Sequence, residues 1–256
     1  MSTLAAAYVV KAAHQLMLAG QWTTAINLLT ATHADDLTEH TALALALAEV
    51  TVDYDFGRDT DHVSAALAAV PDNSWDVNLL KIRKDYATAL SQSGAYDLRD
   101  RLLTLIDEAP DDNRRGRANF WAGAIADNVY EQPDLAFEHY EVALKLAEKC
   151  DDDLLAGQAL RHLGYHARAA GDLVLARNQL ERSTELLQKA GHLRPTLAQQ
   201  SLLAALLRDE GDTAGSRALA TEVNRWARQL DVPFIINETE QLMNQPATRT
   251  PPEHQH

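Results

Sequence analysis

The chain has 256 residues, and its 23 Lys and Arg against 37 Asp and Glu give a formal net charge of −14 at pH 7. That balance argues against proteins that bind nucleic acid or anionic membranes over a broad surface, because both need a basic footprint. An aromatic content of 6%, few Gly and Pro, and abundant Ala and Leu favour helices over an all-β fold.

The first seven residues carry no basic side chain ahead of their apolar run, which is the reverse of a secretory signal. No window approaches the roughly 18 consecutive apolar residues of a membrane span. The single cysteine, Cys150, excludes an intramolecular disulfide and fits a reducing compartment. We therefore expect a cytoplasmic protein with no segment inserted in a membrane.

Six turn positions divide the chain into similar units. They are spaced 37 residues apart up to position 131 and 40 residues apart after it, and they are Gly20, Gly57, Gly94, Glu131, Gly171 and Gly211. Gly is suited to such turns because it adopts left-handed backbone angles at little cost. Apolar residues at three- and four-residue steps on either side predict paired amphipathic helices. In chain order the clearest cover residues 4–19, 22–29, 78–92, 135–149, 154–169 and 173–189.

Clusters of Asp and Asn fall between these units, at residues 34–36, 71–73, 110–112 and 151–153. Their side chains can accept hydrogen bonds from the free N–H groups that open the next helix, and their charge suits a helix start. The alternative for residues 151–153 is a calcium loop, but the spaced oxygen ligands and closing Glu of such loops are missing. We therefore interpret the clusters as helix caps.

This pattern resembles the tetratricopeptide repeat (TPR) family, in its longer bacterial variant. The match is best around Gly171, where Gly164 and Ala176 occupy small-residue positions, and good around Gly20, where Trp22 and Ala25 follow the turn. The resemblance implies an all-α fold: a right-handed α-solenoid of about six TPR-like helix hairpins over residues 4–232. A capping helix would follow at 233–245, with a disordered tail at 246–256.

The resemblance also implies that the first helix of each pair lines a concave groove. Counting back from each turn marker predicts a basic groove that contains no Asp or Glu. Its candidate binding residues are Lys81, Lys84, Trp121, Asn128, Arg161, Tyr165, Arg168 and Arg208. Guanidiniums on one helix face can hold a carboxylate or phosphate bidentately. The open alternative is that the lysines pair with neighbouring acids on a solvated face and that Trp121 belongs to the core.

Candidate chemistry is sparse. His162 and His166 stand four residues apart, a spacing that can bind zinc, but no third ligand is evident. Cys150 is followed directly by three aspartates, and acidic neighbours disfavour a thiolate, which argues against a nucleophile. No phosphate loop, serine elbow or paired-carboxylate motif is present. We therefore expect no catalytic residue, no metal and no cofactor.

The sequence thus predicts a non-catalytic adaptor or scaffold that holds an acidic or carboxylate-bearing peptide in its groove. The expected partner is an acidic protein or peptide, not nucleic acid or membrane, and a second copy of the chain could also pack against the first two repeats. A regulatory sensor of a small molecule or signal peptide is the first alternative. An enzyme built on the repeats, for example through His162 and His166, is the second.

Overall fold

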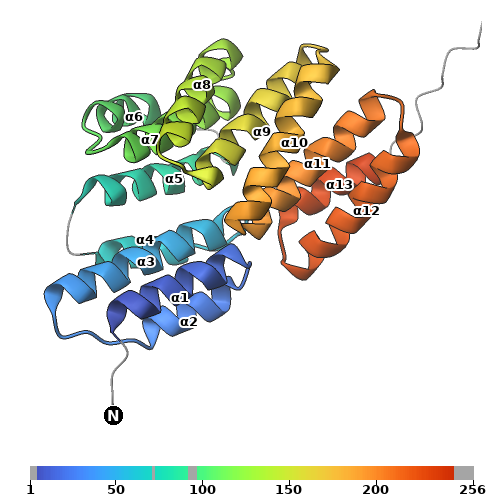
Figure 1. Ribbon diagram of the computed structural model, residues 1–256. Coiled ribbons are helices and arrows are strands. Elements are labelled where there is room, and N and C mark those ends of the chain that lie inside the picture. The colour runs from blue at the N-terminus through green and yellow to red at the C-terminus, as the bar shows by residue number, and fades with distance from the viewer. Residues whose placement is uncertain (1–4, 71–72, 92–96, 245–256) are drawn as a thin grey trace, which may run out of the picture.

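Thirteen α-helices and no strands make up residues 5–70, 73–91 and 97–244, which are the residues that the computed structural model describes (Figure 1). The helices are α1 (Ala6–Leu18), α2 (Trp22–Thr30), α3 (Leu37–Asp55), α4 (His62–Ala69), α5 (Trp75–Ser91), α6 (Leu98–Asp107), α7 (Asp112–Asn128), α8 (Pro133–Lys149), α9 (Asp153–Ala169), α10 (Leu173–Ala190), α11 (Leu193–Asp209), α12 (Thr213–Gln229) and α13 (Pro233–Asn244). The expected all-helical fold is confirmed. Six antiparallel pairs, α1/α2 to α11/α12, are followed by the single helix α13.

Aspartates begin many of these helices. Asp36, Asp111 and Asp152 each accept a hydrogen bond from the backbone N–H three residues later, at 3.0, 2.7 and 2.9 Å. These are the caps that the acidic clusters predict, and they satisfy donors that have no partner inside the helix. Residues 71–72 of the remaining cluster lie outside the described residues. Asp172 and Asp212 cap α10 and α12 in the same way.

The predicted turn markers adopt left-handed backbone angles. Gly20, Gly57, Gly171 and Gly211 have φ between 75° and 94°, and Glu131, which replaces a glycine in the series, has φ 53°. Gly94 lies outside the described residues. Asp151, Gly191 and Asp231 are also left-handed, and they fall between the hairpins. From residue 131 onward a left-handed residue therefore follows a helix every 20 residues, so the helices of the last repeats are 17 or 18 residues long.

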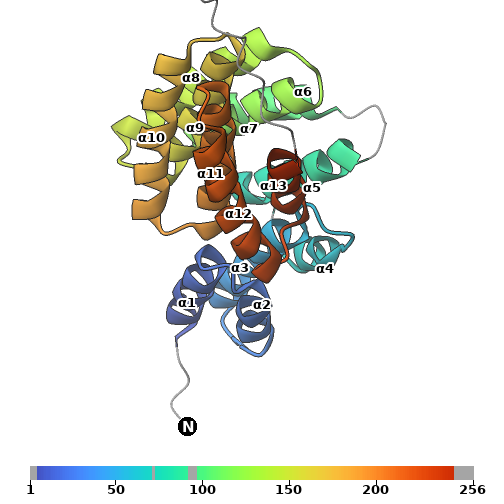
Figure 2. The same ribbon diagram turned by 90° about the vertical axis from the view of Figure 1, so that its right-hand side faces the viewer.

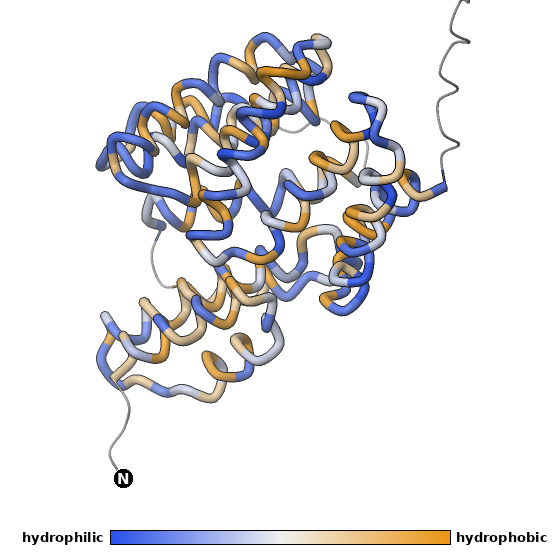
Figure 3. The backbone as a smooth tube through the Cα atoms, turned by 45° about the vertical axis from the view of Figure 1, so that its right-hand side comes forward, coloured by the Kyte–Doolittle hydropathy of each residue, from blue (hydrophilic) through white to orange (hydrophobic). Residues whose placement is uncertain are grey.

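Each helix buries one side, and apolar and polar residues alternate along the tube accordingly (Figure 3). The small residues of the repeat pattern let neighbouring helices approach closely. Gly164 on α9 faces Leu180 on α10, and a Cβ at that position would meet the Leu180 Cδ2 atom at 2.6 Å. Gly123 on α7 faces the ring of Tyr140 on α8 at a comparable distance. Small residues at these positions are therefore required by packing.

The coil of repeats closes on itself. Residues of α1 and α3, such as Val9 and Leu43, belong to the same buried apolar cluster as Leu197, Val223 and Ile235 of α11–α13. Figure 2 shows the two ends of the coil, α1–α3 and α11–α13, next to each other. Repeats in an open solenoid contact only their neighbours, so this closure is a feature that the repeat pattern does not predict.

Polar contacts reinforce the closure. Arg58, which follows α3, donates a hydrogen bond to the carbonyl of Leu230 at 3.0 Å and another to the carbonyl of Asp231. These carbonyls end α12, where a positive charge is favourable. Phe56 meets Phe234 edge-on, with ring centroids 5.9 Å apart. The turn after α3 is thus joined to the end of α12 and the start of α13.

Among the described residues, no helix is both long and apolar enough to cross a bilayer. The tail expected at 246–256 lies outside the described residues.

Candidate functional site

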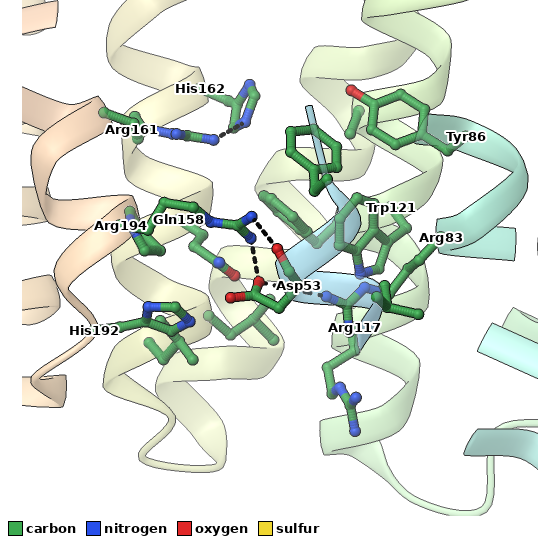
Figure 4. Close-up of a pocket in the computed structure, with 18 of the residues that line it drawn as sticks. Asp53, Arg83, Tyr86, Arg117, Trp121, Gln158, Arg161, His162, His192 and Arg194 are labelled. Atoms are coloured by element: carbon green, nitrogen blue, oxygen red, sulfur yellow. Dashed lines mark hydrogen bonds and ion pairs between the residues drawn. The ribbon is translucent and has the colours of Figure 1, made fainter. Parts of the chain in front are cut away.

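A cavity of about 810 Å³ occupies the middle of the closed coil. Its lining residues in the described part of the chain come from the odd-numbered helices α1 to α13 and from residues that flank them. These are the first helices of the pairs, as the TPR resemblance implies, together with α13. Seven helices therefore build one site. Figure 4 shows part of it, with Asp53, Arg83, Trp121, Arg161 and Arg194 around the same space.

The cavity crosses these helices diagonally. On α1 and α3 it touches the last turns, through residues such as Met17 and Asp53. On α7 it runs along the whole helix, and on α11 it touches the first half, beginning at Arg194. The line of contact moves toward the helix starts because each pair of helices is rotated relative to the one before it.

The structure places four of the eight predicted groove residues at the cavity wall: Trp121, Asn128, Arg161 and Tyr165. The other four lie elsewhere. Lys81 donates to the Asn73 Oδ1 atom at 2.6 Å, and Lys84 lies 3.7 Å from Asp61, both on the side of α5 away from the cavity. Arg168 pairs with Asp209 at 2.5 Å, and Arg208 lies near the end of α11, where the cavity has already moved toward the helix start.

The expectation that the groove holds no acid is wrong. Four arginines line the cavity, but so do five carboxylates: Glu49, Asp53, Asp127, Asp152 and Glu238. The error has the same origin as the misplaced residues, since a constant offset from the turn markers selects the wrong helix face in several repeats. On α5 the cavity side carries Arg83 and Tyr86, and Lys84 is turned about 100° away from Arg83 because successive helical residues are separated by that angle.

Asp53 is the centre of a buried charge cluster. Arg194 donates to the Asp53 backbone carbonyl at 2.8 Å and also pairs with its carboxylate, while Arg83 lies 3.9 Å away on the other side (Figure 4). Trp22 donates to the same carboxylate at 2.8 Å. Burial alone would raise the pKa of Asp53, but Arg194, His192 and Arg83 together with Trp22 lower it. Asp53 therefore stays ionised and joins α3 to α11 across the closed coil of repeats, called the ring below.

Arg161 is the least compensated cation of the cavity. A guanidinium nitrogen lies 2.8 Å from His162 Nε2, and the buried Arg161 Nε has no hydrogen-bond partner. Burial lowers the pKa of Arg161, and burial followed by the charges of Arg161 and His166 holds the pKa of His162 well below its usual value. His162 is thus neutral and accepts the bond, so its Nδ1 carries the proton. Its ring stacks on Tyr140 at 4.5 Å, which fixes its orientation.

Aromatic side chains form the wall opposite Arg161. The Arg83 guanidinium lies 5.1 Å from the centre of the Trp121 ring, and Trp121 meets Tyr86 edge-on at 5.7 Å. Burial lowers the pKa of Arg83 to about 10, so its side chain is still charged at neutral pH. Asn128 donates to the Tyr86 hydroxyl at 3.0 Å. This wall combines a cation with apolar rings, an arrangement that can hold both parts of an amphipathic ligand.

Several cavity residues could not be found from the repeat pattern. Arg83 lies one residue before the predicted Lys84, and Arg117 is not among the predicted groove residues. Arg194 and His192 stand at the start of α11, and Glu238 lies on a helix expected to be a solvent-facing cap. Closure of the ring brings these three side chains to the site, and no local signal in the sequence indicates it.

The two histidines considered for zinc have other partners. His162 contacts Arg161 and Tyr140, and His166 Nε2 lies 3.0 Å from the Asp127 carboxylate. His139 lies on α8 and contacts Asn119. Across residues 5–70, 73–91 and 97–244, no group of three or more His, Cys, Asp or Glu side chains is arranged to hold a metal ion.

Comparison with known proteins shows similarity of structure only. No protein-family model matches the chain, and no curated protein sequence matches it. The chain is similar to the crystal structure of a Rap protein complexed with competence and sporulation factor, with a TM-score of 0.58, 11% identity, and coverage of 93% of this chain and 69% of the other. It is also similar to a signal transduction ATPase with numerous domains (STAND) from Pyrococcus horikoshii, which has a tetratricopeptide repeat sensor.

For the STAND protein the TM-score is 0.51 and the identity 13%, and the match covers 93% of this chain but only 39% of that protein. At such identities the likeness establishes the fold alone. The chain has a TPR-type helical-repeat fold, and the recognition of that fold in the sequence is confirmed.

Proposed function

We propose that this chain is a non-catalytic binding protein that holds a carboxylate-bearing peptide in the central cavity, with Arg161 as the anchor. One observation carries the proposal: Arg161 lines the cavity, its Nε atom is buried without a partner, and its hydrogen bond goes to a neutral histidine. A buried guanidinium without a carboxylate is costly to maintain in the absence of a ligand. A ligand carboxylate would supply the missing acceptor, in the bidentate geometry that arginine favours.

The neighbouring groups support the same role. His162 fixes one edge of the Arg161 guanidinium and leaves the buried Nε unused. Trp121 and Tyr165 supply apolar surface for ligand side chains in the same cavity. The cavity volume of about 810 Å³ falls within the roughly 300–1,000 Å³ typical of pockets that enclose small ligands. A short peptide therefore suits the site better than a long acidic client.

Closure of the ring favours a sensor over an open scaffold. The cavity is bounded by helices from both ends of the coil, so a ligand inside it contacts elements whose mutual packing keeps the coil closed. Binding there can change the stability or shape of the ring and so be reported to a partner. The two similar structures, a Rap protein in complex with a factor and a STAND protein with a repeat sensor, are consistent with this role.

The test uses pooled tetrapeptides of uncharged residues, made with either a free or an amidated C-terminus. Both pools have a free amino terminus, so they differ only in the carboxylate. Immobilised wild-type protein should retain the free-carboxylate pool at least tenfold more strongly, as measured by mass spectrometry of the eluate. A tenfold difference corresponds to about 1.4 kcal/mol, which is within the range of one charge-assisted hydrogen bond.

Arg161→Gln should remove this preference. The matched control is Arg168→Gln, on the same helix but paired with Asp209 outside the cavity, and it should keep the preference. Equal retention of both pools by the wild type would contradict the proposal.

A further inference from the structure

Most charged groups at the cavity wall are already paired within the protein. The pairs are Asp53 with Arg194 and Arg83, Asp127 with His166, Glu49 with His14, and Arg117 with Asp76. Asp152 caps α9 and accepts a bond from Asn113. These groups build the cavity, and each would lose a partner if it turned to a ligand.

Two groups of opposite charge remain. In the part of the chain that the structure describes, His162 is the hydrogen-bond partner of Arg161, and Glu238 forms neither a hydrogen bond nor an ion pair. Arg161 comes from α9 and Glu238 from α13, and both line the same cavity. They influence each other electrostatically without forming an ion pair. The cavity wall therefore carries a cation and an anion that do not pair with each other.

Glu238 differs from its neighbours on α13. Thr239 accepts a hydrogen bond from Asn224 of α12 at 2.9 Å, and Glu240 pairs with Arg228 of α12. These side chains attach α13 to the helix before it. Glu238 lines the cavity instead and stays accessible there, so its charge contributes nothing to that attachment.

We propose that the cavity recognises a zwitterionic ligand, a short peptide whose carboxylate binds Arg161 and whose primary ammonium group binds Glu238. This inference rests on the proposed function and adds the second anchor and the charge of the ligand. A purely acidic peptide would satisfy Arg161 and leave Glu238 as an uncompensated carboxylate beside the bound ligand. A ligand with both charges satisfies both groups and brings no net charge into the cavity.

The state of Glu238 supports this assignment. Desolvation at the cavity wall raises the pKa of the Glu238 carboxyl, and the charge of Arg161 offsets this only in part. A carboxyl group in this state lacks a close cation, and an ammonium group of the ligand would provide one. The ammonium can come from the amino terminus of the peptide or from a lysine side chain, since both present the same group.

The experiment extends the pools of uncharged tetrapeptides to four forms: both termini free, C-terminus amidated, N-terminus acetylated, and both blocked. A fifth pool is acetylated and carries one lysine. A length of about four residues suits a cavity of this volume. Wild type, Glu238→Gln, Arg161→Gln and the control Glu240→Gln are compared by retention on immobilised protein, and circular dichroism and thermal unfolding verify that each variant folds.

The wild type should retain the pool with free termini at least tenfold more strongly than the acetylated pool. In Glu238→Gln this difference should vanish, while the preference for a free carboxylate persists. In Arg161→Gln the preference for a free carboxylate should vanish, while the preference for a free amino terminus persists. Glu240→Gln, on the same helix but paired with Arg228, should behave as the wild type. If the acetylated pool with a lysine is retained as strongly as the pool with free termini, a side-chain ammonium is a sufficient partner for Glu238. If it is not, the partner is the amino terminus of the peptide. Both results support the proposal.

Equal retention of the acetylated and free pools by the wild type would overturn the role of Glu238. The proposed function would survive that result if the preference for a free carboxylate still depended on Arg161. If the amidated pool were retained as well as the free pool, the proposed function and this inference would both fail. If no pool were retained, both would be rejected as well.

Discussion

Replacing Asp53 by asparagine removes one negative charge from between two guanidiniums with almost no change in the shape of the side chain. The side chain of Asp53 is 4% exposed, and those of Arg194 and Arg83 are 13% and 16% exposed, so water screens the cluster weakly. Removing one partner of a buried ion pair typically destabilises a protein by about 3–5 kcal/mol. The amide oxygen of the new side chain could still accept the hydrogen bond from Trp22, so we expect the lower end, about 3 kcal/mol.

Urea unfolding followed by circular dichroism measures this change. The matched control is Asp85→Asn, which removes a charge from a pair with Arg101 in which the two side chains are 37% and 40% exposed. Exposed pairs of this kind contribute about 0–1 kcal/mol, so the control should remain close to the wild type. A loss in Asp53→Asn that is no greater than in Asp85→Asn would refute the argument that this cluster holds the ring closed.

A double-mutant cycle locates the effect. Asp53→Asn and Arg194→Gln remove the two ends of one interaction, so their combined cost should be smaller than the sum of the single costs. Small-angle scattering adds a structural measurement, because the pair joins α3 to α11 across the ring. Loss of closure should increase the radius of gyration of Asp53→Asn while the helical signal persists. An unchanged radius together with unchanged stability would show that the apolar contacts suffice.

Three further predictions follow from the packing and charges. Gly123→Ala places a Cβ 2.7 Å from the Tyr140 ring, and overpacking of about 1–3 kcal/mol should outweigh a gain of about 1 kcal/mol in helix propensity, so urea unfolding should show a net loss. Burial lowers the pKa of His192 to about 4, so around pH 5 to 6.5 the unfolded chain binds more protons than the folded chain. The free energy of unfolding should therefore fall by about 1.6 kcal/mol between pH 6.5 and pH 5, and His192→Gln should reduce that fall. Lys84→Glu alters a residue outside the cavity and should leave peptide retention unchanged; a loss would return Lys84 to the site.

The fold could be predicted because its signals are local. A left-handed Gly at residues 20, 171 or 211 and an aspartate cap at residues 36, 111 or 152 each act within one helical turn. Together they divide the chain into helices whose ends agree with the structure to within a few residues, as at 173–190. Glu131 shows that the spacing is as informative as the residue type, since it takes the left-handed angle expected of glycine at that step.

The site could be predicted only in part because it depends on how the repeats are rotated. Asn128 and Arg168 both stand three residues before their turn markers, yet Asn128 lines the cavity and Arg168 does not. The same offset has different meanings in different repeats, because the line of contact moves along the helices from the first repeat to the last. Predicting the site therefore requires the rotation between successive pairs, and that rotation arises from packing between repeats.

Closure adds a second requirement, and it accounts for the carboxylates at the site. A groove formed by neighbouring repeats in an open coil can be basic throughout, since counterions and water remain available. In a closed coil the arginines are enclosed, and an enclosed charge must be paired. Asp53 pairs with Arg194 from the far end of the chain, so the carboxylates that line the cavity are a consequence of its closure. Arg161 and Glu238 are the two groups that this pairing leaves over, and for that reason we propose that they bind the ligand.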